Sequence, residues 1–279
     1  MADITPALVG KLREMTNAGL MDCKNALVAS AGDLDQAVDI LRKKGAASAA
    51  KKADREAKEG LIAQAVLQGG KIGAIVEINC ETDFVARNDS FKAFAGEIAT
   101  RIATNPSADL EADRVAAVAR IGENIQIRRH ARLEVPGNGL VAAYIHTGGK
   151  VGVLVEVSAL KAETVQHEDF KQLVRDITLQ IAAASPVAIG RDSVPDAVIE
   201  KEKEIAAQSD AIKGKPAQAV AKIIEGKLAK FFETSCLLEQ GFVKNPDLKV
   251  EVHLAAVSKA LGDQIAVRKF LRFQVGEAV

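Results

Sequence analysis

The sequence predicts an α+β fold in which a small N-terminal three-helix module precedes a core unit that occurs twice. Residues 60–78 match residues 139–157 without a gap, and nine of the nineteen pairs are identical. The offset there is 79 residues, whereas residues 121–135 match residues 261–275 at an offset of 140. The second copy therefore contains 61 additional residues. A repeat of this length indicates that one supersecondary unit occurs twice in the chain.

These matches divide the chain into three predicted domains. Residues 1–55 form the N-terminal module, residues 56–138 the first core copy and residues 139–279 the second. The additional residues of the second copy are expected to form a helical hairpin at about 190–250. With 279 residues, of which 48% are hydrophobic, the chain is long enough to bury more than one core.

Three helices are predicted in the N-terminal module because apolar residues recur there at helical spacing. Thr5-Pro6 is typical of an N-cap followed by a first-turn proline, Asn17-Ala18-Gly19 of a turn, and Gly32-Asp33 of another helix start. The apolar stripes are Leu8, Leu12 and Met15, then Leu20, Cys23, Ala26 and Leu27, then Leu34, Val38 and Leu41. The Lys- and Ala-rich segment 42–58 is expected to be an exposed helical end and a linker.

Each core copy predicts a hairpin, a helix and a third strand. Apolar strands flank Gly69-Gly70 in the first copy and Gly148-Gly149 in the second, and glycine supplies the positive φ that tight hairpin turns require. A helix is expected near residues 91–103 and near residues 170–184, followed by a strand of β-branched and Arg residues. Each copy is therefore expected to form an antiparallel three-stranded sheet with helices on one face.

The insert of the second copy predicts a coiled-coil hairpin. Val194-Pro195-Asp196 begins a helix in which Val198, Ile205 and Ile212 recur every seven residues, and Gly214-Lys215-Pro216 reverses the chain. The apolar residues of the second helix are Val220, Ile223, Ile224, Leu228 and Phe231. Two interpretations remain open, because the hairpin either packs only against itself or forms a contact with a partner or with a second copy in a homodimer.

Composition argues against several function classes. Lys plus Arg and Asp plus Glu both number 37, so the net charge is zero and no global positive field favours nucleic acid. Cys23, Cys80 and Cys236 lie far apart without a secretory segment, which predicts reduced thiols and a cytoplasmic location. No apolar run reaches the roughly 18 residues of a membrane helix, since the least charged stretch, 179–190, is short and contains Pro186. We expect contact neither with a membrane nor directly with nucleic acid.

The sequence contains no pattern typical of a catalytic or metal-binding site. The four histidines lack H-x-x-x-H spacing, the cysteines form no C-x-x-C, and G-x-S-x-G does not occur. Ile72 and Val151 follow the Gly-Gly-Lys triplets, where a phosphate-binding loop requires Ser or Thr. Cys80 and His146 could form a thiol nucleophile and its base, so a thiol enzyme stays open as an alternative. Otherwise the chain is predicted not to be an enzyme.

Segment 79–85, Asn-Cys-Glu-Thr-Asp-Phe-Val, looks like an exposed insertion that only the first copy carries. Phe84 lies between Asp83 and the polar residues 87–89, so its ring is either tucked under its own loop or presented outward. The residues alone favour the tucked ring. Aromatic residues make up only 4% of the chain, and a loop Phe beside an acid is a candidate hot spot for binding.

Three stretches of the chain resemble the motifs of the bacterial elongation factor Ts family, the guanine-nucleotide exchange factors of elongation factor Tu. Segment 79–85 resembles the signature loop of that family, and we use this name for it below. Segment 20–27, Leu-Met-Asp-Cys-Lys-Asn-Ala-Leu, resembles the amino-terminal signature, and segment 121–129, Ile-Gly-Glu-Asn-Ile-Gln-Ile-Arg-Arg, resembles a core strand. The motifs occur in the family's order on a duplicated core, so the resemblance covers nearly the whole chain.

The resemblance implies a function for the signature loop. In the family the loop Phe, here Phe84, is pushed between helices of the GTPase domain of elongation factor Tu, and Asp83 helps to place it. Thr82 and Val85 complete the segment that dislocates Mg²⁺. Disturbing the Mg²⁺ site and the phosphate-binding loop releases GDP, so that GTP rebinds. The resemblance implies no cofactor for the chain itself, which acts on the GDP and Mg²⁺ of its partner.

The resemblance also implies contacts with elongation factor Tu outside the loop. Leu20, Met21 and Lys24 match the contact surface of the amino-terminal module, and Ile121 and His146 match contacts from the two core copies. From the residues alone, Leu20 and Ile121 could equally be core residues and Lys24 a solvated charge. Two alternatives of other classes remain beside the exchange factor, namely the thiol enzyme and a passive scaffold that dimerises through the hairpin, and the signature loop favours the exchange factor.

Overall fold

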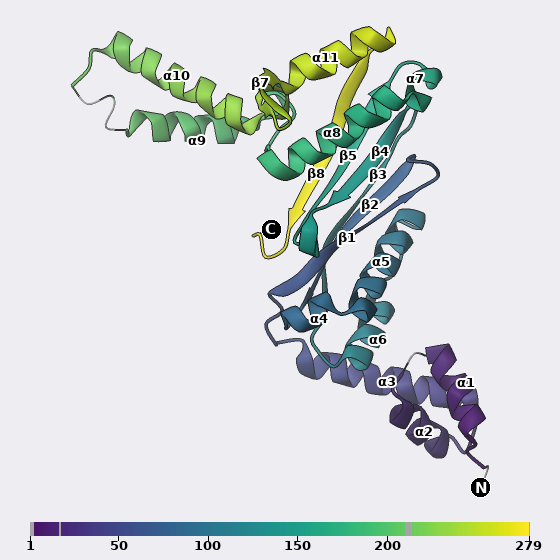
Figure 1. Cartoon of the computed structure of the whole chain (residues 1–279). Helices are drawn as coiled ribbons and strands as arrows, with labels where there is room; N and C mark the ends of the chain where they lie inside the picture. The colour runs from purple at the N-terminus through teal and green to yellow at the C-terminus, as the bar shows by residue number, and fades with distance from the viewer. Residues whose placement is uncertain (1–2, 17, 210–211, 213, 279) are drawn as a thin grey trace.

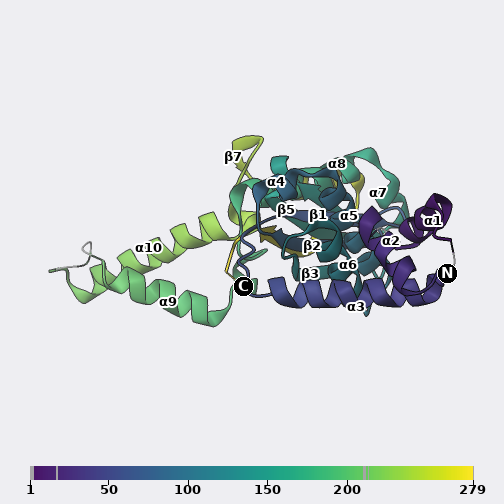
Figure 2. The same ribbon diagram turned by 90° about the horizontal axis from the view of Figure 1, so that it is seen from below.

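The computed structural model describes residues 3–16, 18–209, 212 and 214–278 of the chain (Figure 1). The molecule is elongated, with the N-terminal helices at one end, two sheets in the middle, and a helical hairpin that projects beyond the second sheet (Figures 1 and 2). Both large sheets are three-stranded and antiparallel, so the predicted α+β class is confirmed. Asn17 of the predicted first turn lies outside the described residues.

The N-terminal module consists of α1 (Pro6–Thr16), α2 (Leu20–Ala29) and the first part of α3 (Leu34–Lys52). Two predicted helix starts are confirmed, because Thr5 Oγ1 accepts a hydrogen bond from the backbone N–H of Leu8 (3.3 Å) and Asp33 Oδ1 accepts one from that of Gln36 (2.9 Å). The buried residues of this module are Val9, Leu12, Cys23, Ala26, Leu27 and Ala37. Met15 and Leu20 of the predicted stripes are instead exposed.

Helix α3 continues through most of the segment that was expected to be exposed and linker-like. It ends only at Lys52, and Gly45 and Ala49 within it are buried. Gly45 faces α6 (Glu111–Ile121), where an added Cβ would lie 3.3 Å from Cγ1 of Val115. The expectation of a linker is therefore wrong for this part of the chain, because small residues allow two helices to approach closely without any large apolar side chain.

The first core copy contains β1 (Glu59–Leu67), β2 (Ile72–Cys80) and β3 (Gln126–Glu134), in the order β1-β2-β3. The hairpin turn between β1 and β2 uses positive φ at Gly69 (63°) and Gly70 (91°), as predicted. The helices of this copy are α4 (Asp83–Arg87), α5 (Asp89–Thr104) and α6. Helices α4 and α5 pack on one face of the sheet, and Phe91 and Ile98 share a buried cluster with side chains of β2 and with Val118 of α6.

The second core copy repeats this arrangement. Its sheet contains β4 (Gly139–Ile145), β5 (Val151–Ala159) and β8 (Ile265–Gln274), in the order β4-β5-β8, with the short 3₁₀ turn η1 (Thr147–Gly149) in the hairpin. Its helices are α7 (Ala162–Gln166), α8 (Glu168–Ala184) and α11 (Val250–Leu261), which correspond to α4, α5 and α6. Neither α6 nor α11 is predicted from the sequence, although Val250, Leu254, Val257 and Leu261 of α11 recur at helical spacing.

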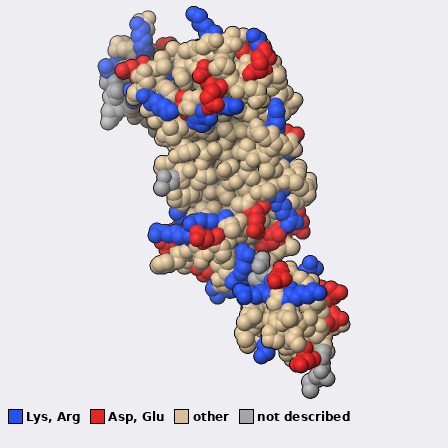
Figure 3. Space-filling model, turned by 45° about the vertical axis from the view of Figure 1, so that its right-hand side comes forward, with Lys and Arg blue, Asp and Glu red and all other residues tan. Residues whose placement is uncertain are grey.

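The two sheets pack face to face, so that their helices lie on the outer sides of a sandwich (Figure 1). The residues buried between them are Ile62, Ile75, Leu133 and Val135 from the first copy and Val141, Leu154 and Phe273 from the second. A hydrogen bond from the backbone N–H of Val141 to the carbonyl oxygen of Gly70 (2.6 Å) joins the copies at one rim. Figure 3 shows a band almost free of charged side chains at this level of the molecule.

The insert forms the predicted antiparallel hairpin from α9 (Asp196–Ala207) and α10 (Ala217–Ser235). Its base is a small core of Ala188, Val194, Phe232 and Cys236. The predicted apolar seam is off by one residue at two places, since Ala206 and Phe232 are buried while Ile205 is exposed and Phe231 only partly buried. Short elements flank the hairpin, namely η2 (Arg191–Ser193), η4 (Leu237–Glu239), β6 (Gly241–Phe242) and β7 (Asn245–Lys249).

Candidate functional site

The signature loop is formed by the end of β2 and the start of α4, and it is not an insertion. The second copy has a helix of the same five-residue length, α7, at the same distance from the preceding strand. The next long helix also begins equivalently in both copies, after a capping side chain from Asn88 or His167. The expected insertion is therefore wrong, and the copies differ in side chains, because Phe84 stands where the second copy has Glu163.

Phe84 points into solvent and is the most exposed large hydrophobic residue among those described, with 82% of its surface accessible. The expectation that the ring is tucked under its own loop is wrong. Ala86 is buried and Val85 packs against the first core, and these two residues fix the rotation of α4. Because residues two apart lie on roughly opposite faces of a helix, anchoring Ala86 directs Phe84 outward.

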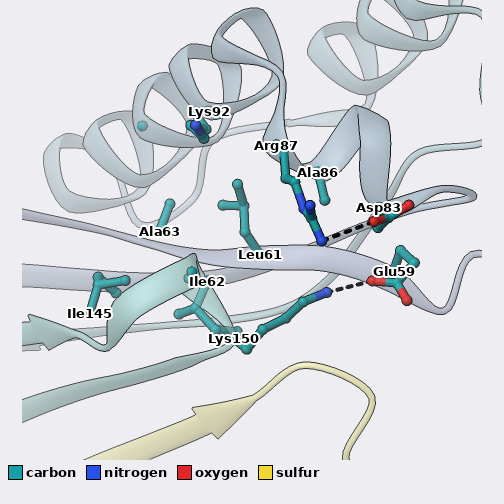
Figure 4. Close-up of a pocket in the computed structure, with 13 residues that line it drawn as sticks. Glu59, Leu61, Ile62, Ala63, Asp83, Ala86, Arg87, Lys92, Ile145 and Lys150 are labelled. Carbon is teal, nitrogen blue, oxygen red and sulfur yellow. Dashed lines mark hydrogen bonds and ion pairs between the residues drawn. The ribbon is translucent and has the colours of Figure 1, made fainter.

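The polar residues of α4 hold its backbone. Thr82 is the N-cap, and its Oγ1 accepts a hydrogen bond from the backbone N–H of Val85 (3.3 Å). Asp83, in the first turn, forms an ion pair with Arg87 one turn later (3.0 Å), as Figure 4 shows. A negative charge at the start of a helix and a positive one at its end both suit the helix dipole.

The Glu123 carboxylate, which lies outside the signature loop, accepts hydrogen bonds from the backbone of the loop. Glu123 Oε2 accepts hydrogen bonds from the backbone N–H groups of Glu81 (2.9 Å) and Thr82 (3.1 Å), and Glu123 Oε1 accepts one from Thr82 Oγ1 (2.6 Å). In return Glu81 Oε1 accepts a hydrogen bond from the backbone N–H of Asn124 (2.6 Å). Glu123 is not among the residues predicted from the sequence, where its only signal is its place within the motif 121–129.

A cleft of about 860 Å³ lies beside α4, where the two core copies meet (Figure 4). Leu61 and Ala63 of β1 form its floor, Ala86 and Arg87 one wall, and the η1 turn of the second copy the other. Its charges are paired, since Lys150 contacts Glu59 (2.5 Å) and Arg87 contacts Asp83.

The N-terminal residues of the predicted contact surface lie on an exposed face of α2. Leu20 and Met21 are 56% and 62% exposed, and Lys24 is exposed as well. Val28 continues this face one turn further and is also exposed, although the sequence analysis does not select it. We call these four residues the α2 face. Helix α2 lies away from α4 in both views, so the α2 face and the helix that carries Phe84 are separate parts of the surface (Figures 1 and 2).

Ile121 and His146 occupy different environments. Ile121 is the last residue of α6 and not part of a strand, because Gly122 ends that helix with a φ of 89°. Its side chain is half-buried against the first core. The strand expected from this motif begins only at Gln126. His146 is exposed directly after β4, with its Nδ1 3.1 Å from the hydroxyl oxygen of Tyr144. It adjoins the η1 turn that lines the cleft.

Cys80 is a core residue whose environment disfavours a thiolate. Burial, with a smaller contribution from the nearby Glu123 carboxylate, raises the pKa of Cys80 to about 12. Its Sγ donates to the carbonyl oxygen of Thr82 (3.2 Å), and the side chain of His146 is hydrogen-bonded to Tyr144. A thiol nucleophile requires the opposite shift, so this geometry argues against the thiol-enzyme alternative.

Within residues 3–16, 18–209, 212 and 214–278, no group of three or more His, Cys, Asp and Glu side chains is arranged to hold a metal ion. No helix in the same ranges is at once long and apolar enough to span a bilayer.

Comparison with known proteins gives one consistent result. The family model described as elongation factor TS matches residues 81–277. The chain is 42% identical to elongation factor Ts of Nitratidesulfovibrio vulgaris (strain DP4) over 276 residues, covering 98% of this chain and 96% of that protein. It is 45% identical to elongation factor Ts of Nautilia profundicola over 293 residues, covering 100% of this chain and 95% of that protein.

Proposed function

The chain belongs to the elongation factor Ts family, a family of translation elongation factors, and we propose that it is the nucleotide exchange factor of elongation factor Tu. It binds elongation factor Tu in its GDP form in the cytoplasm and promotes GDP release by disturbing the Mg²⁺ and phosphate-binding site. GTP then rebinds. The observation that carries this proposal is Phe84, an aromatic ring 82% exposed on a helical turn that is itself anchored.

The proposed activity is a change of affinity and needs no bond chemistry or cofactor on this chain. A factor that binds the nucleotide-free partner more tightly than the GDP form must weaken GDP binding by the same factor. Mg²⁺ is among the largest local charges that offset the phosphates, so displacing its ligands removes much of the attraction that holds GDP. An apolar ring pushed into the partner beside that site would supply the displacement.

In this proposal the α2 face and Phe84 have different roles. The α2 face, Leu20, Met21, Lys24 and Val28, supplies binding area that is separate from Phe84, because α2 lies away from α4. Phe84 supplies the displacement, while Asp83, Thr82 and Val85 set the geometry of its helix. His146 approaches the same partner from the second core copy, across the cleft. Homodimerisation through the α9–α10 hairpin stays a separate prediction.

Release of a fluorescent GDP analogue from elongation factor Tu, followed by stopped flow in excess unlabelled GDP, tests the proposal. The wild-type protein is expected to accelerate release strongly and Phe84→Ala to do so weakly. Glu163→Ala is the matched control, since Glu163 is the exposed equivalent of Phe84 on α7. If the wild type leaves release unchanged, the chain is not an exchange factor for this partner. If Phe84→Ala and Glu163→Ala are equally fast, the ring is not the displacing group.

A further inference from the structure

The hydrogen bonds of Glu123 recur in the second core copy. Asp263 accepts hydrogen bonds from the backbone N–H groups of Leu160 (3.3 Å) and Lys161 (3.0 Å). At the repeat offsets of 79 and 140, these three residues are the equivalents of Glu123, Glu81 and Thr82. We call the arrangement the carboxylate clamp. Its recurrence shows that it belongs to the duplicated scaffold, where it ties the start of the short helix to the turn after the third helix.

The turn that carries each clamp has the same backbone. Gly122 and Gly262 end α6 and α11 in the left-handed region, with φ of 89° and 60°, and the clamping carboxylate follows directly. This conformation favours glycine and turns the chain sharply, so that the next side chain faces the short helix of the same copy. The carboxylate is thus placed by a rigid turn, and it is charged, which makes its hydrogen bonds stronger than neutral ones.

The two clamps differ at the residue that caps the short helix. In the first copy Glu123 also accepts a hydrogen bond from Thr82 Oγ1 (2.6 Å), and that hydroxyl accepts the one from the backbone N–H of Val85. In the second copy Lys161 replaces Thr82, its Nζ donates to the carbonyl oxygen of Gly262, and the N-cap of α7 makes no side-chain hydrogen bond. Asp263 forms a side-chain hydrogen bond with Thr164 inside α7 instead. In the first copy the hydrogen bonds therefore lead from Glu123 through the N-cap residue Thr82 to the helix of Phe84, whereas Asp263 reaches α7 through Thr164 and not through an N-cap.

We propose that Glu123 is a positioning residue for nucleotide exchange, which fixes the N-cap of α4 and thereby the direction in which Phe84 leaves the surface. The inference rests on the proposed function. A helix of five residues has little stability of its own, so its geometry depends on the groups that anchor it. Phe84 is exposed and has few contacts to hold it, and an ordered ring loses less entropy on entering a partner than a mobile one.

The test compares Glu123→Ala with Asp263→Ala, the same truncation of the two clamps, in the GDP-release assay at increasing concentrations of the factor. Glu123→Ala is expected to lower the maximal release rate about tenfold, which is the effect of losing one or two charge-assisted hydrogen bonds. The half-saturating concentration of the factor should change by less than about threefold. Asp263→Ala is expected to stay within about twofold of the wild type in both quantities. Glu123→Gln should restore most of the rate, because its amide can serve both the backbone N–H groups and the Thr82 hydroxyl.

A second variant, Thr82→Val, tests the same link without changing Glu123. It removes only the hydroxyl that joins the Glu123 carboxylate to the N-cap of α4, and it replaces Glu123→Ala in the assay if circular dichroism shows that Glu123→Ala is unfolded. In a Phe84→Ala background, Thr82→Val and Glu123→Ala should add little, because they act through the ring. The inference is overturned if Glu123→Ala or Thr82→Val releases GDP as fast as the wild type, or if Asp263→Ala loses as much as Glu123→Ala. A wild type that does not accelerate release would instead refute the proposed function.

Discussion

Gly73 and Gly152 occupy equivalent positions in the two core copies, and each faces the sheet of the other copy at its closest approach. A Cβ added to Gly73 would collide with Val141 and lie 2.8 Å from Cδ1 of Leu154, and one added to Gly152 would collide with Ile62. The absence of a side chain at both positions allows the sandwich to close.

Replacing either of these glycines with alanine should therefore destabilise the protein. We expect Gly73→Ala and Gly152→Ala each to lower the free energy of unfolding by about 1–3 kcal/mol, the typical cost of overpacking a core. Gly226→Ala is the control, since no atom lies within 4 Å of that site in α10 and alanine should stabilise the helix by up to about 1 kcal/mol. Urea unfolding measures all three, and equal stabilities would show that the sheets can separate to accept a methyl group.

Phe84→Ala should leave the fold intact. The ring is 82% exposed, so its removal should change the free energy of unfolding by less than about 0.5 kcal/mol. Thermal unfolding followed by circular dichroism checks this, with Phe91→Ala, fully buried in the first core, as a control expected to cost about 3–5 kcal/mol. Global unfolding of Phe84→Ala would mean that the ring is part of the scaffold.

Phe84→Ala should slow nucleotide exchange more than Asp83→Ala. A hot-spot aromatic contributes about 2 kcal/mol or more to an interface, roughly thirtyfold in rate, whereas the exposed pair of Asp83 with Arg87 contributes at most about 1 kcal/mol. The loss from Asp83→Ala should also shrink at high salt, because screening weakens a surface ion pair. Equal losses from the two variants would reassign the displacing role to the acid.

Cys80 should remain a thiol at neutral pH. Its pKa is raised from 9.0 to about 12, so the folded protein should react slowly with iodoacetamide at pH 8 and the urea-unfolded protein quickly. The raised pKa favours folding below about pH 9, and this contribution is lost as the pH rises from 9 towards 12. Rapid labelling of native protein at Cys80, with loss of exchange in Cys80→Ala, would revive the thiol-enzyme alternative.

The α2 face should affect affinity and not stability. Met21→Ala and Val28→Ala each remove exposed apolar surface, so we expect weaker binding to elongation factor Tu, by about threefold to tenfold, without a change in melting temperature. Leu27→Ala, on the buried side of the same helix, should cost about 2–5 kcal/mol of stability. Calorimetric titration of the partner measures the first effect, and unchanged affinity in both exposed variants would remove this face from the interface.

The features predicted from the sequence are those with a local signal, such as a glycine turn or apolar residues at helical spacing. Both β-hairpins, both long helices and the α9–α10 hairpin follow from glycine pairs and apolar spacing. The helix α6 and the second half of α3 do not, because their contact depends on small residues such as Gly45, whose role is visible only when the partner helix is known.

The orientation of Phe84 could not be predicted from the loop sequence. It depends on the rotation of one helical turn, which is set by the burial of Ala86 and by the hydrogen bonds of Glu123. Glu123 lies about forty residues further along the chain, so no local pattern connects it to the loop. The resemblance identifies the loop, and only the tertiary contacts explain how its ring is presented.

The face-to-face packing of two similar sheets has an evolutionary consequence. Each copy uses the same face towards the other, as Gly73 and Gly152 do, which is the geometry of a symmetric dimer joined into one polypeptide. In a true dimer every substitution would appear on both halves. Once joined in tandem, the halves could differ, and here one carries an aromatic residue on its short helix while the other carries a long hairpin. Because the two halves have different surfaces, one partner can bind such a molecule in a single orientation, whereas a dimer of identical halves would present two equivalent sites.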